Sequence, residues 1–342
     1  MPRVHAPRAG RDAQSGAPLI AQVYAALADA RFHSGESLAR TLGVSRSAVW
    51  KAVAALRQGG AELHAVRNRG YRLVHGSEPL EPVKIRVHLA PAVRERVGRI
   101  DVAWSIDSTN TALLARPNPH YGTCEVLLAE YQSAGRGRRG RSWVAPPGGA
   151  LCLSMSWTFR EVPQDLGALG LVIGVCALRA LGAHGIDGVT LKWPNDLLIG
   201  ERKLAGVLID LRAESSGPAA VVIGIGLNVA LGATMLAEIA ASGTAATDLS
   251  AAGGALTARN ELAGALVSTC LEGLLAFESQ GLRPFIEDFR AADALRGRAV
   301  SVSAVQGVAR GVARGIDVRG ALMVETPQGL RRFISGDVSV RL

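Results

Sequence analysis

The segment from Gly188 to Leu211 reads GVTLKWPNDLLIGERKLAGVLIDL and decides the fold of the central part of the chain. It contains two strand-like runs, GVTLKWPN and KLAGVLIDL. Pro194 should stop the first strand and leave Asn195 and Asp196 at a turn, where functional groups often lie. A purely structural turn is equally compatible with these residues.

Further strand-like runs surround this segment between about residues 98 and 290: EVLLAEY, ALCLSMSWTF and AAVVIGIGLNV. They mix with helical stretches at about 165–184 and 257–280, which indicates an α/β or α+β core. Gly224 and Gly226 in the last run would allow a ligand or another backbone to approach closely. The most apolar window, 166–182, is interrupted by Arg179 and is short for a membrane span of about 20 residues. It therefore predicts a buried core helix.

Residues 18–58 show helical periodicity in three bursts, PLIAQVYAALADA, SGESLARTLG and SRSAVWKAVAALRQGG. Ser34 with Ser37 can begin the second helix, Gly43 can end it, and Ser45 can cap the third. The alternating AELHAVRNRGYRLV predicts a hairpin with a basic tip, which completes a winged helix-turn-helix over residues 18–76. Eight basic against three acidic residues in this range suit a module that binds a polyanion.

The remaining boundaries follow from composition. Residues 1–17 are rich in Arg, Pro, Gly and Ala and predict a disordered tail, not a secretory signal. Residues 77–97, which begin with Pro79 and Pro82 in SEPLEPVKI, predict a linker and the entry to the core, and residues 98–290 form the central core itself. Short strands separated by Gly-rich turns at 291–342 are typical of a small SH3-like barrel. The expected fold class is multidomain α+β.

The four cysteines are far apart and show no CxxC spacing, so neither a zinc site nor a disulfide framework is expected. A reducing cytoplasm is the simplest location. With 48% hydrophobic and 20% charged residues, the composition is that of a globular protein.

A second motif, GRGRRGRSW at 135–143, combines glycines that turn backbone N–H groups toward an anion with arginines that bind carboxylate or phosphate. By itself it is compatible with a solvated basic run or a nucleic-acid contact. Lysine is scarce, since Lys192 and Lys203 are two of only four in the chain. Both lie in the segment 188–211, where the compact ammonium of a lysine would suit a point contact with a phosphate or carbonyl oxygen. The alternative is that both are ordinary surface lysines.

Taken together, DSTN at 107–110, YQSAGRGRRGRSW, KWPNDLL with RKLAGVLID, and GIGLNV resemble the biotin protein ligases that also act as biotin operon repressors. The order and spacing match, and the resemblance extends over nearly the whole chain after the tail. It includes FHSGESLARTLGVSRSAVWK and the wing NRGYRL.

The resemblance implies an ATP-dependent ligase that forms biotinyl-5′-AMP and transfers the biotinyl group to a lysine of a biotin carrier protein. The implied biotin-binding residues are Ser108, Thr109, Asn110, Gln132, Arg136, Gly137, Arg138, Lys203 and Gly206. The implied nucleotide-binding residues are Arg138, Arg141, Trp143, Asn195 and Asn228. Lys203, Arg138 and Asp196 are the expected catalytic residues. Mg²⁺ is expected on the ATP phosphates and not in a protein metal site. For Ser108 to Asn110, helix capping is the plain alternative.

The DNA-contacting residues are expected to be Ser45, Arg46, Ser47, Trp50 and Lys51 on the recognition helix and Arg67 and Arg69 on the wing. The resemblance implies a homodimer on a two-fold operator, favoured by bound biotinyl-AMP. Three alternatives remain open. They are a ligase whose helix-turn-helix no longer regulates, a repressor that senses biotin without catalysis, and a lipoate-attaching relative.

Overall fold

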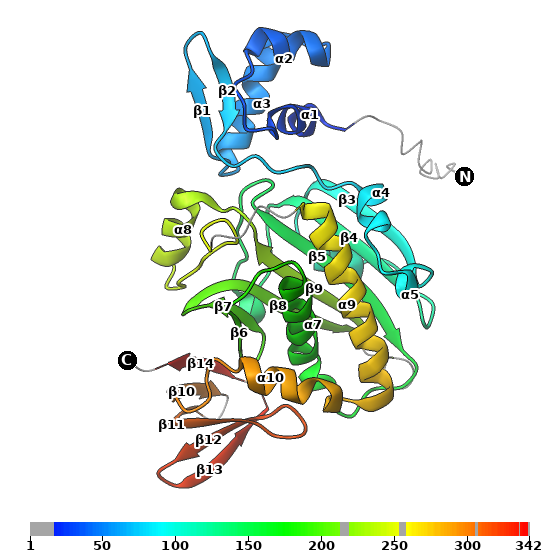
Figure 1. Ribbon diagram of the computed structural model, residues 1–342, viewed down its shortest axis with the longest axis vertical. Helices are drawn as coiled ribbons and strands as arrows, with labels where there is room; N and C mark the ends of the chain where they lie inside the picture. Colours follow the sequence, from blue (N-terminus) through cyan, green and yellow to red (C-terminus); the bar gives the residue numbers. More distant parts are fainter. Residues whose placement is uncertain (1–16, 213–218, 253–257, 305–306, 335, 341–342) are drawn as a thin grey trace, which may run out of the picture.

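The computed structural model describes residues 17–212, 219–252, 258–304, 307–334 and 336–340. Figure 1 shows an N-terminal module at one end of the molecule, a large central sheet with helices, and a small C-terminal sheet at the other end. Apart from Ala17, the segment predicted to be a disordered tail lies outside the described residues.

The N-terminal module is a helix-turn-helix, as predicted. Its helices are α1 (Leu19–Leu27), α2 (Gly35–Leu42) and α3 (Arg46–Gln58). The Ser34 hydroxyl accepts the Ser37 backbone N–H at 3.0 Å, and the Ser45 hydroxyl accepts that of Ala48 at 3.2 Å. Gly43 ends α2 in the left-handed conformation at φ 66°. These contacts confirm the caps that the sequence predicts.

The wing is an antiparallel hairpin of β1 (Leu63–Val66) and β2 (Gly70–Leu73). Asn68 at φ 62° and Gly70 at φ 98° make the turn. A Cβ on Gly70 would lie 2.0 Å from the His33 carbonyl oxygen, so glycine is required at this position. The His33 backbone pairs with that of Tyr71, which ties the wing to the segment before α2.

The central domain is built on a seven-stranded sheet in the order β3-β4-β5-β9-β8-β7-β6. Only β3 and β4 are parallel, and the other described pairs are antiparallel. The strands are β3 (Val97–Ile106), β4 (Cys124–Gln132), β5 (Ala150–Phe159), β6 (Val189–Lys192), β7 (Asp196–Ile199), β8 (Arg202–Arg212) and β9 (Ala219–Asn228). Of the two classes left open, the mixed sheet corresponds to α+β.

Different helices cover the two faces of the sheet. Helices α7 (Leu169–Ala183) and α9 (Arg259–Gln280) cover one face, where Trp157, Phe159 and Phe277 are fully buried (Figure 1). The helical stretch 166–183, which includes α7, and the helix α9 pass a length and hydropathy test for membrane spans, but 61% of each apolar window is buried inside the protein. The expected core helix is thus confirmed. The short helix α6 (Thr109–Leu114) packs on the opposite face against Leu127 and Val222.

The segment predicted as a linker is fastened to the core. It contains α4 (Pro82–Val87) and α5 (Pro91–Arg94), which pack against α9. Just before α4, the Leu80 backbone N–H donates to Glu130 Oε1 at 2.6 Å, and the Arg259 guanidinium donates to the Glu78 carbonyl at 3.2 Å. Arg259 and Glu130 form a buried ion pair at 2.8 Å. Burial favours the neutral form of Arg259, but Glu130 outweighs this effect and raises the Arg259 pKa.

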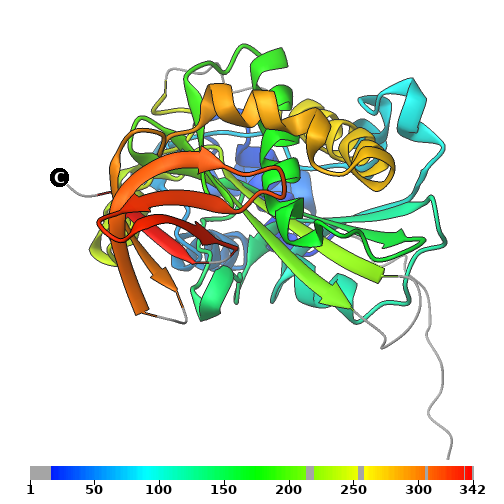
Figure 2. The same cartoon turned by 90° about the horizontal axis from the view of Figure 1, so that it is seen from below.

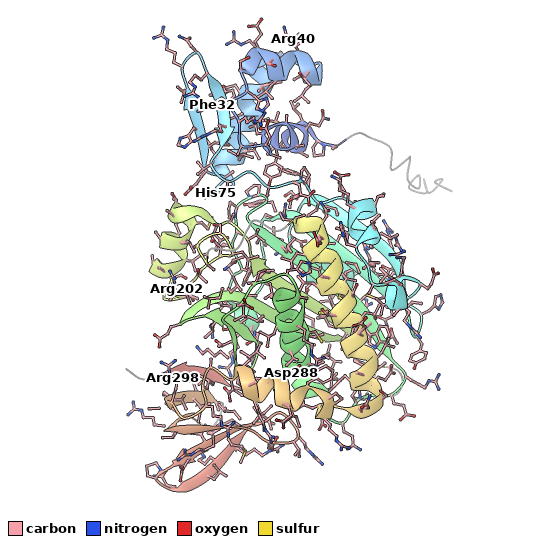
Figure 3. The ribbon with its side chains drawn as sticks, viewed as in Figure 1. Phe32, Arg40, His75, Arg202, Asp288 and Arg298 are labelled. Carbon is pink, nitrogen blue, oxygen red and sulfur yellow. The ribbon has the colours of Figure 1, made fainter. Side chains whose placement is uncertain are left out.

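The helix-turn-helix module also contacts the core directly. The Tyr24 ring of α1 lies 5.4 Å from the Trp104 ring of β3, and its hydroxyl hydrogen-bonds with that of Ser77 at 2.7 Å. Burial raises the pKa of the Tyr24 phenol. Glu62 accepts the Thr234 N–H at 3.1 Å at the start of α8 (Gly232–Ala241). Figure 3 shows Arg40 at the outer end of the module and His75 at the end near the core.

The C-terminal segment forms a five-stranded antiparallel sheet in the order β13-β12-β11-β10-β14, which Figure 2 shows from below. Its strands are β10 (Ala299–Ala304), β11 (Gly307–Ile316), β12 (Leu322–Thr326), β13 (Gly329–Phe333) and β14 (Asp337–Val340). Among the described residues no β13–β14 pairing closes a barrel, so the closed SH3-like barrel is replaced by an open sheet. Its buried side chains join the main core cluster, next to α10 (Ile286–Ala292).

Candidate active site and nucleic-acid interface

A narrow pocket lies on the face of the sheet that α7 and α9 leave open. Strict alternation along β9 turns Ile223 and Ile225 into the core and Gly224 and Gly226 toward the pocket. A Cβ on Gly224 would lie 2.3 Å from Asn110 Oδ1, and one on Gly226 would lie 2.4 Å from the Trp143 ring. The close approach that the glycines predict is therefore made here by two side chains.

A chain of hydrogen-bonded side chains, which we call the polar chain, runs along and behind one wall of the pocket. It consists of Gln132, Thr109, Ser154, Asn110, Asp210 and Arg136. Gln132 Oε1 accepts a hydrogen bond from the backbone N–H of Thr109 at 2.8 Å and lies 3.1 Å from the Thr109 hydroxyl. The Ser154 hydroxyl lies 2.7 Å from Thr109 Oγ1 and 2.6 Å from Asn110 Oδ1. Ser108 caps α6, so its capping interpretation is confirmed.

The arginine-rich loop covers the mouth of this pocket. Backbone bonds from Gly137 to the Arg141 carbonyl at 2.7 Å and from Trp143 to the Gly135 carbonyl at 2.8 Å hold its base. A Cβ on Gly135 would lie 2.3 Å from the Trp143 carbonyl oxygen, which explains the glycine there. The loop thus folds against the sheet as a compact turn.

Lys203 lies at the junction between this pocket and a second cavity of about 480 Å³. Its ammonium forms an ion pair with Asp196 at 2.7 Å and lies 5.8 Å from the Trp143 ring centroid. A β-bulge brings it there: Leu197 pairs with Ala205 and Leu198 with Lys203, which leaves Leu204 unpaired. The bulge reverses the alternation and turns Lys203 to the pocket side of β8.

Both cavities share five lining residues: Gly137, Arg138, Trp143, Asn195 and Lys203. Arg138 donates to Asn195 Oδ1 at 3.0 Å, and Asn195 Nδ2 donates to the Val207 carbonyl at 2.7 Å. Asn228 lines the second cavity and donates to the Thr247 carbonyl at 2.9 Å. An anion in each cavity could therefore meet the other beside one lysine and one arginine.

All nine residues expected to bind biotin line the first pocket, and all five expected to bind nucleotide line the second. Sequence reasoning did not identify Ser154 and Asp210, which complete the polar chain. Ser154 contacts Thr109 and Asn110 from β5 and does not itself line the pocket, and no motif marks it. Cys152 also lines this pocket, and burial raises its thiol pKa to about 12, which keeps the thiol neutral.

Comparisons with known proteins show what this chain is similar to. Residues 102–228 match the Biotin/lipoate A/B protein ligase family, residues 20–72 an HTH domain and residues 297–341 the Biotin protein ligase C terminal domain. The bifunctional ligase/repressor BirA of Salmonella typhimurium is 37% identical over 315 residues, which cover 92% of this chain and 95% of that protein. The chain belongs to the biotin protein ligase family. The Escherichia coli BirA ligase is also 37% identical, over 94% of this chain and 96% of its own length.

Among solved structures of biotin protein ligases, that from Aquifex aeolicus in complex with biotin and ATP is similar to this chain. It is 26% identical with a TM-score of 0.58, and the match covers 71% of this chain and 98% of that chain. The similarity thus extends over most of the present biotin protein ligase.

The helix-turn-helix of this biotin protein ligase presents the predicted nucleic-acid residues to solvent. Ser45, Arg46, Ser47, Trp50 and Lys51 at the start of α3 are exposed, as are Arg67 and Arg69 at the wing tip. Trp50 is 61% exposed, which is unusual for so large an apolar side chain. Arg69 stacks on the Phe32 ring at 4.2 Å, and Figure 3 shows Phe32 beside the wing. The recognition helix and the wing thus each expose cationic side chains.

Proposed function

We propose that the protein joins biotin to ATP as biotinyl-5′-AMP, transfers the biotinyl group to a lysine of a biotin carrier protein, and represses biotin synthesis genes. The observation that carries the enzymatic part is the position of Lys203 and Arg138 between two cavities. We assign DNA binding to residues 18–76, catalysis to 98–290 and a supporting role to 291–342, with 77–97 as the connection.

Biotin would occupy the pocket beside the polar chain. Amide and hydroxyl groups of Ser108, Thr109, Asn110 and Gln132 suit a ureido ring, which both donates and accepts hydrogen bonds. Gly206 and the glycines of β9 leave room for the apolar valeryl chain. The pocket holds only about 50 Å³ of space because Trp143 lies on Gly226. Biotin entry would therefore require Trp143 to move away from Gly226.

In the first step, a carboxylate oxygen of biotin attacks the α-phosphorus of ATP. A new P–O bond forms, the bond between the α- and β-phosphates breaks, and pyrophosphate leaves. Two anions must approach each other, so the cations Lys203 and Arg138 hold them in place and stabilise the charge of the transition state. Arg141, Trp143, Asn195 and Asn228 would bind the nucleotide in the second cavity.

Mg²⁺ fits this site as a companion of ATP. Within the described residues no group of three His, Cys, Asp or Glu side chains could form a metal cage. Asp196 lines the second cavity, but it is paired with Lys203. The ATP phosphates would hold the ion. Mg²⁺ keeps several of its waters, so it needs no dedicated cage of protein ligands. When bound, Mg²⁺ supplies charge neutralisation on the phosphates.

In the second step, the amine of the acceptor lysine attacks the carbonyl carbon of biotinyl-AMP. An amide bond forms, the bond to the phosphate oxygen breaks and AMP leaves. The amine must lose a proton, and Asp196 beside Lys203 can position the amine or accept that proton. Cys152 is buried and its raised pKa keeps the thiol neutral, so it is a poor nucleophile. The two steps above proceed without a covalent enzyme intermediate.

Regulation follows from the second surface. The exposed cations of α3 and the wing would hold phosphates of operator DNA, and a minority of the side chains would contact base edges. A single winged helix binds weakly, so a homodimer on a two-fold operator is the natural arrangement, with biotinyl-AMP as corepressor. Four buried free thiols support a reducing cytoplasm.

The decisive experiment incubates the purified protein with biotin, MgATP and a biotin carrier domain and follows the mass of the carrier. We expect the gain of one biotinyl group. The Lys203→Ala and Arg138→Ala variants should slow it by about 10²–10³-fold, the typical effect of removing one donor to a developing charge.

No gain, despite tight binding of biotin, would contradict the ligase assignment and favour a biotin-sensing repressor. Competition between biotin and lipoate separates the biotin ligase from a lipoate-attaching relative. Operator binding with and without biotinyl-AMP tests whether the helix-turn-helix regulates. Failure to bind would leave a ligase whose helix-turn-helix has only a structural role.

A further inference from the structure

Asp210, near the end of β8, connects two residues of the biotin pocket that come from different parts of the chain. Its Oδ2 accepts Asn110 Nδ2 at 2.9 Å. Its carboxylate also accepts hydrogen bonds from two nitrogens of Arg136, Nη1 at 3.2 Å and Nη2 at 3.3 Å. The Asp210 side chain is only 19% exposed, whereas that of Arg136 is 44% exposed. A partly buried carboxylate on the rigid sheet thus anchors the first arginine of the loop.

The hydrogen-bond inventory fixes the orientation of Asn110. A carbonyl oxygen cannot donate, so the Ser154 hydroxyl must be the donor to Asn110 Oδ1 at 2.6 Å. The Nδ2 group then faces Asp210, as a carboxylate requires. Asn110 is itself buried, and its amide lies directly against Gly224, where a Cβ would come within 2.3 Å of Oδ1. Asp210 and Ser154 therefore decide which face of this amide the pocket presents.

The paired nitrogens determine the place of Arg136. A two-point contact between a guanidinium and a carboxylate sets both position and plane, which a single contact does not. The Arg136 backbone also pairs with that of Ser142 across the loop. Anchoring Arg136 to Asp210 therefore places the loop beside the pocket, whose lining also includes Lys203, itself paired with the Asp196 carboxylate.

We propose that Asp210 is a positioning residue for the ligase reaction, which holds Arg136 over the bound biotin and orients Asn110 in the wall. This inference rests on the proposed function. Asp210 acts through these two neighbours and not on the reacting atoms. Its loss therefore weakens the binding of biotin and leaves the binding of ATP nearly unchanged.

The test compares Asp210→Asn, Asp210→Glu and Arg136→Gln by biotin-dependent exchange of pyrophosphate into ATP, and by calorimetric titration with biotin. Asp210→Asn keeps an acceptor for Asn110 but loses the charge that holds Arg136. We expect its Kd and KM for biotin to rise about tenfold, or about 1.4 kcal/mol. The KM for ATP and the melting temperature should stay near those of the unaltered protein. Asp210→Glu retains the charge and should recover most of the affinity.

The matched control is Asp288→Asn, which breaks an exposed pair with Arg179 at 2.7 Å between α10 and α7; Figure 3 labels Asp288 on α10. It should leave both KM values unchanged. The double variant of Asp210→Asn with Arg136→Gln should bind biotin no more weakly than the weaker single variant, because one acts through the other.

A biotin Kd for Asp210→Asn within twofold of the unaltered protein would overturn the proposal. So would equal losses for biotin and ATP with a lower melting temperature, or single effects that multiply in the double variant. If the unaltered protein shows no exchange at all, the proposed function fails instead, and the two failures are distinguishable.

Discussion

Replacing Arg259 by alanine should destabilise the protein by about 3–5 kcal/mol, the usual cost of leaving one member of a buried ion pair without its partner. Arg259 is 1% exposed, and it donates to Glu130 at 2.8 Å, to the Ala150 carbonyl at 3.1 Å and to the Glu78 carbonyl at 3.2 Å. The substitution removes all three bonds and leaves the Glu130 carboxylate buried. Because domains are stable by only about 5–15 kcal/mol, this loss is a large fraction of the total.

The measurement is urea unfolding followed by tryptophan fluorescence and circular dichroism. Arg179→Ala, in which both partners of the broken pair are more than 40% exposed, is the control and should cost about 1 kcal/mol or less. Arg259→Met combined with Glu130→Leu should recover part of the loss, since no charge is then left unpaired. The reasoning is refuted if Arg259→Ala unfolds at the same urea concentration as the unaltered protein, or if the double variant is less stable than the single one.

Three further predictions concern titratable groups. Burial raises the pKa of Cys152 and of Cys176 to about 12, so Ellman's reagent at pH 8 should modify neither in the native protein and both in denaturant; rapid native labelling would contradict this. Burial also raises the pKa of Asp293, so the stability that this carboxyl contributes at low pH is lost as the pH rises through its folded pKa. Asp293→Asn should therefore stabilise the protein more at pH 7 than at pH 3, and urea titrations at the two pH values test the sign. Asp196→Asn should slow transfer from preformed biotinyl-AMP to the carrier by about 10²-fold, with a smaller effect on adenylation; equal slowing in single-turnover assays would exclude the proton role.

The sequence predicts best where local chemistry decides. Ser34, Gly43 and Ser45 mark helix ends through contacts with residues three or four positions away, and all three act as expected. The motifs likewise identify the residues that line both cavities, because the resemblance carries information about tertiary structure that no single stretch contains.

Long-range features are the ones that sequence patterns miss. Strict alternation back from Gly206 would turn Lys203 into the core, and only the bulge at Leu204 turns it to the pocket. The Arg259–Glu130 pair joins residues that are 129 positions apart, and neither lies in a recognisable motif. Asp210 similarly finds Asn110 and Arg136 through the fold alone. Whether the C-terminal strands close into a barrel depends on the pairing of β13 with β14, which alternation within each strand does not determine.

The attachment of residues 78–81 to the core affects which spacing between operator half-sites the proposed dimer can bind. A free flexible tether of a few residues would let the recognition helices of a dimer settle over a range of distances. Here the tether is held by Glu130, Arg259 and Asn260. The two recognition helices of the proposed dimer would therefore lie at one fixed distance from each other. Inserting one base pair between half-sites also rotates one of them by about a tenth of a helical turn. A rigid protein cannot follow that rotation, so the spacing between half-sites becomes as much a part of the recognition signal as the bases themselves.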